Sequence, residues 1–272
     1  PFIAYRYNAP LIGSPFTITF LKRVLEDEKR KIPNKLIAVN ENSSYTIKGK
    51  SSEYTAEMIH MTHSIPHTTM VALHTPEGIV VYGNDFKIDY TPILESPPNF
   101  NALRRISKEG IKVAILDSLY CSSETKTPSE NVARNMVKDV FSGMHGNKSA
   151  IFISTFSSHI ARLKSIIDFG KKLDRDIIFM GRSLHKYFLA AHDAKIIELK
   201  NQVRLVTYKN QVISALKKIN NEREKYLVVC TGHQGEPGSV LDRLSRRKLP
   251  FEFRKDDNLI FSSKTIPLPV NI

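Results

Sequence analysis

The sequence predicts an α/β protein in two parts: residues 1–118, rich in strands, and residues 119–272, with a parallel sheet flanked by helices. Hydrophobic residues make up 41% and charged residues 25% of the 272 positions, a balance typical of globular domains. In the second part, short apolar runs alternate with helical stretches, which is the pattern of βαβ units with parallel strands. In the first part, short strand-like runs follow a single helical stretch.

The first part is expected to contain one amphipathic helix and a series of strands. The apolar positions of residues 16–31 share one helical face, and Pro33 ends that helix. Residues 69–86 predict a hairpin, because two apolar runs flank a turn that contains Pro and Gly. Residues 112–118 are apolar almost throughout, which predicts a strand buried on both faces. Further strands are expected at residues 35–39, 44–47 and 54–61.

The second part is expected to repeat a strand–loop–helix unit. Thr127 is the expected N-cap of its first helix, with Glu130 at the capping-box position and the helix ending at Gly143. Strands are expected at residues 149–154, 176–180, 226–230 and 258–261, and helices from residue 159, at 184–194 and at 240–246.

Positive charge is concentrated in the second part. Residues 1–118 hold 14 basic and 12 acidic residues, whereas residues 119–272 hold 26 and 15. A basic half beside a nearly neutral one indicates a polyanionic partner, most economically nucleic acid. A basic surface that serves only solubility is the alternative.

The loops that follow the strands of the second part share Ser, Thr, Gly and basic residues. Backbone N–H groups and the positive end of a helix dipole favour anions at such loops. Taken singly, each loop is also explained by helix capping, but four on one sheet edge fit the successive phosphates of a nucleic acid. The candidate phosphate-binding residues are Ser154, Thr155, Ser157, Ser158, Arg182, Ser183, Gly232, Gln234, Gly235, Ser262, Ser263 and Lys264.

Histidines and carboxylates lie close together along the first part. Residues three apart on a strand face opposite ways, so the histidines cannot all converge, and polar packing is the alternative for each. Asp85 and Asp117 are expected at the ends of buried strands, where an unpaired carboxylate is costly without a cation. Both are therefore candidate metal or acid–base groups. The histidines are His60, His63, His67 and His74.

A series of motifs carries a family resemblance. His63-Ser-Ile-Pro, His74-Thr-Pro-Glu-Gly and Asp85-Phe-Lys-Ile-Asp resemble the third and fourth signature segments of the β-CASP branch of the metallo-β-lactamase superfamily. Within that branch the chain is most similar to the ribonuclease J family in its archaeal form. The resemblance continues through Leu116-Asp-Ser, Ser154-Thr-Phe-Ser-Ser-His-Ile-Ala-Arg, Gly181-Arg-Ser, Cys230-Thr-Gly-His-Gln-Gly-Glu-Pro-Gly-Ser and Phe261-Ser-Ser-Lys-Thr-Ile-Pro.

The resemblance implies a partial metallo-β-lactamase αββα sandwich over residues 1–118, followed by a β-CASP domain over residues 119–272. It implies a zinc-dependent ribonuclease that hydrolyses RNA phosphodiester bonds as a 5′–3′ exonuclease, an endonuclease or both, with two zinc ions in the full-length enzyme. His63 would be a zinc ligand, Asp85 would bridge both ions, and Asp117 would hold a catalytic histidine in place. The strand-end loops would contact the RNA backbone.

Two segments of the family pattern are absent from this chain: the His-x-His-x-Asp-His segment, which supplies most of the zinc ligands, and the C-terminal Ser-Gly-His segment. The chain is therefore expected to be an interior piece, inactive by itself and with an empty or partial zinc site. A non-catalytic RNA- or nucleotide-binding module and a DNA nuclease of the same superfamily are the alternatives.

Cysteine usage and hydropathy bear on the setting of the protein. Cys121 and Cys230 form no Cys-x-x-Cys pair, which favours a reducing compartment and points to the cytoplasm. The longest stretch without Asp, Glu, Lys or Arg, residues 58–76, carries four histidines, so no membrane partner is expected. A homodimer is expected for the full-length protein.

Overall fold

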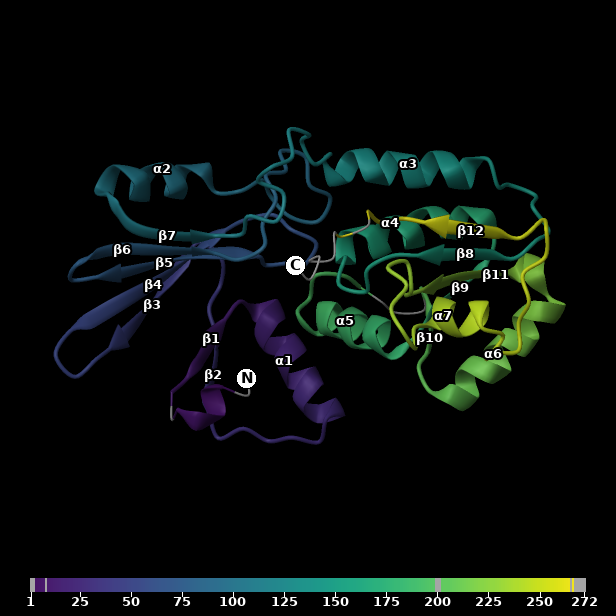
Figure 1. Cartoon of the computed structure of the whole chain (residues 1–272), viewed down its shortest axis with the longest axis horizontal. Coiled ribbons are helices and arrows are strands. Elements are labelled where there is room, and N and C mark those ends of the chain that lie inside the picture. The colour runs from purple at the N-terminus through teal and green to yellow at the C-terminus, as the bar shows by residue number, and fades with distance from the viewer. Residues whose placement is uncertain (1–2, 8, 199–201, 265, 267–272) are drawn as a thin grey trace. The chain divides into compact units, whose positions relative to one another are not determined.

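The computed structural model describes residues 3–7, 9–198, 202–264 and 266 of the chain (Figure 1). Residues Thr265 and Pro267 of the last sequence motif lie outside this range. The chain divides into two compact units, Pro1–Asn131 and Val132–Ile272; the charge distribution and the motifs placed the boundary after residue 118. None of the helices in the described ranges combines the length and the apolar character that a membrane crossing requires.

The first unit is built around a five-stranded sheet with the strand order β3-β4-β5-β6-β7. The first four strands are antiparallel neighbours, and β7 pairs with β6 in parallel. Helix α2 (Phe100–Glu109) lies along one face of this sheet in Figure 1, and its Ile106 packs with Ile59 and Met70. The strands are β3 (Ser43–Lys48), β4 (Glu53–His60), β5 (Thr69–Thr75), β6 (Gly78–Gly83) and β7 (Ile111–Leu116).

A smaller substructure precedes this sheet. A 3-10 turn, η1 (Ala4–Arg6), comes first, and strands β1 (Leu11–Gly13) and β2 (Leu36–Ala38) then pair in parallel, with helix α1 (Pro15–Asp27) between them in the chain. The helix ends earlier than the apolar spacing predicts. Lys29 has a left-handed φ of 52°, and the Arg30 N–H donates to the carbonyl of Leu25 at 2.9 Å. This C-terminal capping pattern closes the helix before the chain reaches Pro33.

The second unit is a five-stranded, fully parallel sheet with the strand order β10-β9-β11-β8-β12. Its strands are β8 (Ile151–Ser154), β9 (Asp176–Met180), β10 (Arg204–Val206), β11 (Tyr226–Cys230) and β12 (Asn258–Phe261). The helices are α3 (Glu130–Ser142), whose first two residues belong to the first unit, α4 (Ile160–Gly170), α5 (Arg182–Asp193), α6 (Lys209–Asn221) and α7 (Val240–Ser245), with 3-10 turns η2 (Lys171–Leu173) and η3 (Arg223–Lys225).

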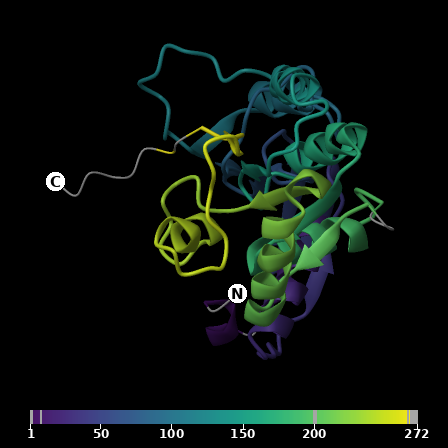
Figure 2. The same ribbon diagram turned by 90° about the vertical axis from the view of Figure 1, so that its right-hand side faces the viewer.

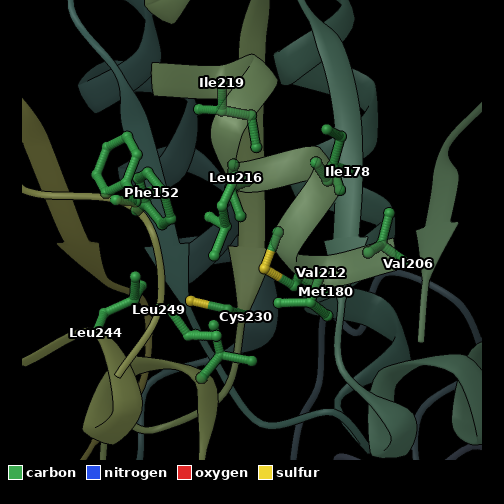
Figure 3. Packing of buried hydrophobic residues seen from close by; sticks show 14 of the residues in the cluster. Phe152, Ile178, Met180, Val206, Val212, Leu216, Ile219, Cys230, Leu244 and Leu249 are labelled. Atoms are coloured by element: carbon green, nitrogen blue, oxygen red, sulfur yellow. The ribbon is translucent and has the colours of Figure 1, made fainter. Parts of the chain in front are cut away.

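Alternate residues of the parallel strands form a core on each face of this sheet. On one face, Phe152 and Cys230 pack against residues of α6 and α7, as Figure 3 shows; α6 is the light-green helix beside the strands in Figure 2. On the other face, the rings of Phe179 and of Phe188 from α5 lie 4.7 Å apart. Helices on both faces confirm the predicted parallel sheet with flanking helices.

Two further predicted details are wrong. Helix α3 begins at Glu130 and not directly after an N-cap at Thr127, because the carboxylate of Asp89 accepts a hydrogen bond from the Glu130 N–H at 2.7 Å and fixes the start of the helix there. Strand β7 is exposed at every residue and not buried on both faces. It is an edge strand with one neighbour, β6, and the described residues place no second layer over it.

Candidate functional site

The segments that carry His63 and Asp85 are neighbours in the first unit. His63 follows β4, Asp85 follows β6, and the two segments are joined by a bridge between Thr62 and Lys87. The Lys87 N–H donates to the Thr62 carbonyl at 2.7 Å, and the Thr62 hydroxyl donates to the Lys87 carbonyl at 2.5 Å. The bridge brings both segments to one edge of the sheet, as the predicted metal site requires.

The expected burial of the two candidate carboxylates is wrong. Asp85 and Asp117 are both exposed, because Asp85 lies in a turn after β6 and Asp117 follows the exposed edge strand β7. One oxygen of Asp117 accepts a hydrogen bond from the Leu119 N–H at 3.2 Å. Because neither carboxylate is buried, the cost of burying a charge no longer argues for a cation at either residue. Both remain candidate metal or acid–base groups on their position alone.

The buried carboxylate of this region is Asp89, which is 3% exposed. It accepts hydrogen bonds from the backbone N–H groups of Thr91 at 3.0 Å and Glu130 at 2.7 Å, and it pairs with the ammonium of Lys87 at 3.2 Å. Burial acts to raise its pKa, but the hydrogen bonds from Ser129 and these groups outweigh burial and hold the pKa below its usual value. Its partners make Asp89 a structural residue.

The four histidines of the first unit do not all converge on one site, as their spacing predicts. The Nε2 of His60 lies 2.9 Å from the Ser96 carbonyl oxygen, and His74 pairs with Glu57 at 3.0 Å. The Nδ1 of His63 lies 3.2 Å from the hydroxyl of Ser64. His60 and His74 are thus each engaged by another partner.

The strand-end loops of the second unit share one edge of its sheet. In the parallel register, Cys230 at the end of β11 is opposite both Ser154 and Met180, and Phe261 is opposite Ser154. The loops after β8, β9, β11 and β12 therefore leave the sheet on the same side, at the carboxyl ends of the arrows in Figure 1. This is the edge where open parallel sheets bind their ligands.

Three of the predicted phosphate ligands have a different role. Ser154 and Thr155 are 0% exposed and Ser262 is 9% exposed, so their hydroxyls do not reach a ligand at the surface. The Ser154 hydroxyl donates to the Cys230 carbonyl at 3.1 Å, and the Thr155 hydroxyl donates to the Ser262 carbonyl at 2.9 Å. These side chains are short enough to be covered by the sheet edge, and they hold the loops in place.

The loops after β11 and β12 are also tied to each other. The Gln234 side-chain amide donates to the Lys264 carbonyl at 3.0 Å and accepts from the Ile266 N–H at 3.1 Å. Arg182 and Lys264 are exposed, and Arg182 is the first residue of α5. The remaining predicted ligands, which are exposed or half-buried, are Ser157, Ser158, Ser183, Gly232, Gly235 and Ser263.

Gly232 shows why the loop after β11 needs glycine. Its φ of +125° is a conformation that side chains rarely adopt, and a Cβ there would lie 2.6 Å from the Leu241 Cβ and 2.7 Å from the Ser239 hydroxyl. The same tight approach lets the loop reach the start of α7, where the Ser239 hydroxyl accepts a hydrogen bond from the Asp242 N–H at 3.2 Å.

Sequence reasoning assigned no role to two residues of this edge. The guanidinium of Arg162, in α4, donates hydrogen bonds to the carbonyl and the hydroxyl of Ser262, the residue that follows β12. His233 lies against Phe156, with the ring centroids 4.1 Å apart, and within the described ranges neither of its buried ring nitrogens has a hydrogen-bond partner. Burial lowers the pKa of His233, which favours the neutral form of its ring. Both residues stand inside motifs, but no spacing rule distinguishes them from ordinary loop and helix residues.

Comparisons with known proteins show which proteins the chain is similar to. Residues 148–271 match the family model for the β-CASP domain of ribonuclease J. The chain is 39% identical over 273 residues to ribonuclease J of Methanocaldococcus jannaschii, covering 100% of this chain and 60% of that protein. It is 37% identical over 266 residues to ribonuclease J of Pyrococcus abyssi, covering 97% and 58%. The chain thus spans about 60% of the length of these relatives.

Most of the second unit thus matches a β-CASP domain. The chain as a whole is similar to the ribonuclease J proteins. A solved structure from Enterococcus faecalis V583, described as a protein of unknown function, matches with a TM-score of 0.57, covering 94% of this chain and 64% of that one. At 12% identity, that likeness concerns the fold alone.

Proposed function

We propose that this chain belongs to a zinc-dependent ribonuclease of the metallo-β-lactamase β-CASP class, which hydrolyses RNA phosphodiester bonds from the 5′ end, internally or both. The observation that carries the proposal is the shared edge of the parallel sheet, where four loops with Ser, Gly and basic residues lie side by side. Successive loops of this kind suit the regularly spaced phosphates of one strand.

The residues of the second unit would bind and orient the RNA. The guanidinium of Arg182 stands at the N-terminus of α5, where the helix dipole adds to its attraction for a phosphate. Lys264 would contribute a second positive charge from the loop after β12. Gly235 leaves the backbone open to close approach, since nothing lies within 4 Å of a Cβ built there.

The residues of the first unit would contribute to a zinc site. Imidazole and carboxylate are donors that zinc accepts, and a site needs about four ligands, so His63 and Asp85 fit as part of a set. When bound, the zinc ions would supply Lewis acidity at phosphorus and an activated water. One carboxylate oxygen of Asp117 is held by the Leu119 N–H, which would orient the other toward a histidine partner. The sandwich fold of this unit is part of the same proposal.

The cellular setting belongs to the same proposal. We place the protein in the cytoplasm, in keeping with the free thiols of Cys121 and Cys230. A homodimer is proposed for the full-length protein on the family resemblance, and light scattering after gel filtration tests it.

The test is RNA hydrolysis by a protein of the relatives' length, with Asp85→Asn as the variant and Asp139→Asn, an exposed residue of α3, as the matched control. Asp85→Asn is expected to lower the hydrolysis rate by more than about 100-fold, since even outer-shell changes at metal sites cost about 10- to 100-fold. RNA affinity is expected to stay unchanged, because the phosphate-binding loops are intact. The 272-residue chain alone is expected to bind RNA without cleaving it.

Each alternative has its own outcome in this assay. RNA binding with no hydrolysis by the unmutated protein would identify a non-catalytic RNA-binding module. Equal hydrolysis of single-stranded DNA and RNA of one sequence would favour the DNA nuclease. Full activity of Asp85→Asn would contradict the assignment of the metal ligands.

A further inference from the structure

Three side chains of the kinds that can ligate a metal, none of them His63 or Asp85, come from three separate segments and meet in the first unit. Glu41 lies between β2 and β3, His67 lies between β4 and β5, and Glu95 lies between β6 and α2. One ligand atom from each residue lies within 4.8 Å of the others. All three side chains are half-buried, so they form a site enclosed by the loops and not a patch of solvated charges.

The chain holds these ligands in place with its own hydrogen bonds. The backbone N–H of His67 donates to Oε1 of Glu95 at 2.6 Å. The Nδ1 of His60 lies 3.5 Å from Oε1 of Glu41. The Nε2 of His60 lies within hydrogen-bond distance of the carbonyl oxygen of Ser96, which is next to Glu95 in the chain. Supporting contacts of this kind are typical of the groups that surround and orient metal ligands.

Charge and geometry both favour a cation here. The carboxylates of Glu41 and Glu95 are close enough to repel each other, and half-burial reduces the screening of that repulsion by water. His67 has a left-handed φ of 55°, a backbone conformation uncommon for histidine, and this conformation brings its ring and its N–H to the same carboxylate pair. A divalent ion between the three side chains would offset both negative charges.

One contact competes with such an ion. The N–H of Phe16, in the first turn of α1, donates to Nδ1 of His67 at 3.3 Å, near the long limit for a hydrogen bond. An ion bound at Nδ1 takes the lone pair that this N–H uses, and an ion bound at Nε2 requires the ring proton on Nδ1. Metal binding at either nitrogen therefore releases the Phe16 N–H, which gives the site a local spectroscopic signature.

We propose that Glu41, His67 and Glu95 bind one divalent transition-metal ion of the Zn²⁺ or Mn²⁺ kind, which ties the three segments together. One imidazole and two carboxylates suit these ions, whereas thiolates would be needed to select Cu⁺ and oxygen ligands alone would suit Ca²⁺ or Mg²⁺. The three protein ligands leave a position for water. The proposal uses none of the residues assigned to RNA hydrolysis and does not depend on that function.

Calorimetric titration of the 272-residue chain with ZnCl₂ and with MnCl₂ tests the proposal. The unmutated chain is expected to bind one ion with an affinity that Glu95→Gln and Glu41→Gln each reduce by at least about tenfold. Asp85→Asn and His63→Asn are expected to keep this affinity. Glu57→Gln is the matched control, because Glu57 also pairs with a histidine, His74, at 3.0 Å outside the proposed site.

A second readout uses only the unmutated chain, so it remains informative if the variants fold poorly. In the unmutated chain, the amide resonance of Phe16 is expected to shift on titration with diamagnetic Zn²⁺. Three outcomes would overturn the proposal: no binding by the unmutated chain, binding that Asp85→Asn or His63→Asn removes while Glu95→Gln and Glu41→Gln keep it, or binding without a shift at Phe16.

Discussion

The guanidinium of Arg162 donates two hydrogen bonds to Ser262, one to its backbone carbonyl at 2.7 Å and one to its hydroxyl at 2.9 Å. Thr155 donates to the same carbonyl at 2.9 Å. The loop of residues 262–264 is therefore held to the start of α4 by side chains as well as by the pairing of β12 with β8. Arg162 is a positioning residue for this loop in the proposed RNA site.

Replacing Arg162 should separate positioning from charge. Arg162→Ala is expected to lower the affinity for single-stranded RNA about tenfold, the size of one charge-assisted hydrogen bond. Arg162→Lys keeps the charge without the planar, two-pronged donor, so it is expected to lose most of the same affinity with an unchanged salt dependence. Fluorescence anisotropy at several salt concentrations measures both. If Arg162→Lys bound RNA as the unmutated chain does, charge alone would explain the role of Arg162.

The sequence pattern predicts the second unit well because its signals are local. Strands β9, β11 and β12 occupy the predicted residues, since each is a short apolar run that ends at a Gly or Ser loop. The alternation with helices then determines the parallel arrangement. Strand β10 and helix α6 were not predicted. A strand of three residues has too few positions to show a hydrophobic period. Helix α6 follows this strand directly, so no recognised strand announced the helix.

Burial was harder to predict than secondary structure. The apolar composition of β7 is that of a central strand, but its position at the sheet edge leaves it exposed. The composition of a strand shows whether its side chains could be buried. Whether they are buried depends on the place of the strand in the sheet, which the composition does not give. The same limit explains Asp85 and Asp117, whose expected burial depended on the strands before them.

The exposure of β7 predicts a large difference between two isoleucines. Ile115 of β7 is 52% exposed, whereas Ile153 of β8 is 0% exposed. Ile153→Ala is expected to lower the free energy of unfolding by about 2–5 kcal/mol, through lost burial and the cavity left behind. Ile115→Ala is expected to cost less than about 1 kcal/mol. Urea denaturation followed by circular dichroism measures both, and equal losses would mean that β7 is covered in solution.

Asp89 should make the stability of the first unit depend on pH. Its pKa is held below the usual 3.8 by hydrogen bonds that outweigh burial, so its contribution is present above that value and is lost as the pH falls through the lower, folded pKa. Asp89→Asn is expected to destabilise the unit by about 1–3 kcal/mol at pH 7. The difference from the unmutated chain should shrink below about pH 3.8. Thermal unfolding between pH 2 and pH 7 measures it, and a difference independent of pH would show that charge plays no part.

For the candidate phosphate residues, the motifs predicted the position of the loops but not which side chains are exposed. The prediction that the strand-end loops share one edge is confirmed by the parallel register, because the carboxyl ends of parallel strands must meet there. Which hydroxyls face outward depends on packing between loops distant in sequence. Thr155 bonds to Ser262, and no local pattern reveals such a pairing. Arg162 and the Glu41–His67–Glu95 group escaped sequence reasoning for the same reason.

The central claim is that the carboxyl edge of the parallel sheet binds the phosphates of RNA. A salt titration of single-stranded RNA binding by the 272-residue chain tests it most directly, with Arg182→Ala at the edge and Lys148→Ala as the control. Lys148 is exposed and precedes β8, so it removes one positive charge at the opposite, amino end of the strands.

The logarithm of the binding constant is expected to fall linearly with the logarithm of the salt concentration. Each phosphate contact contributes about −0.7 to the slope, so three or four contacts predict a slope of about −2 to −3. Arg182→Ala should reduce this slope by about one contact and weaken binding equally for all sequences, whereas Lys148→Ala should leave binding nearly unchanged. Binding that is insensitive to salt, or that the two variants weaken equally, would contradict the account.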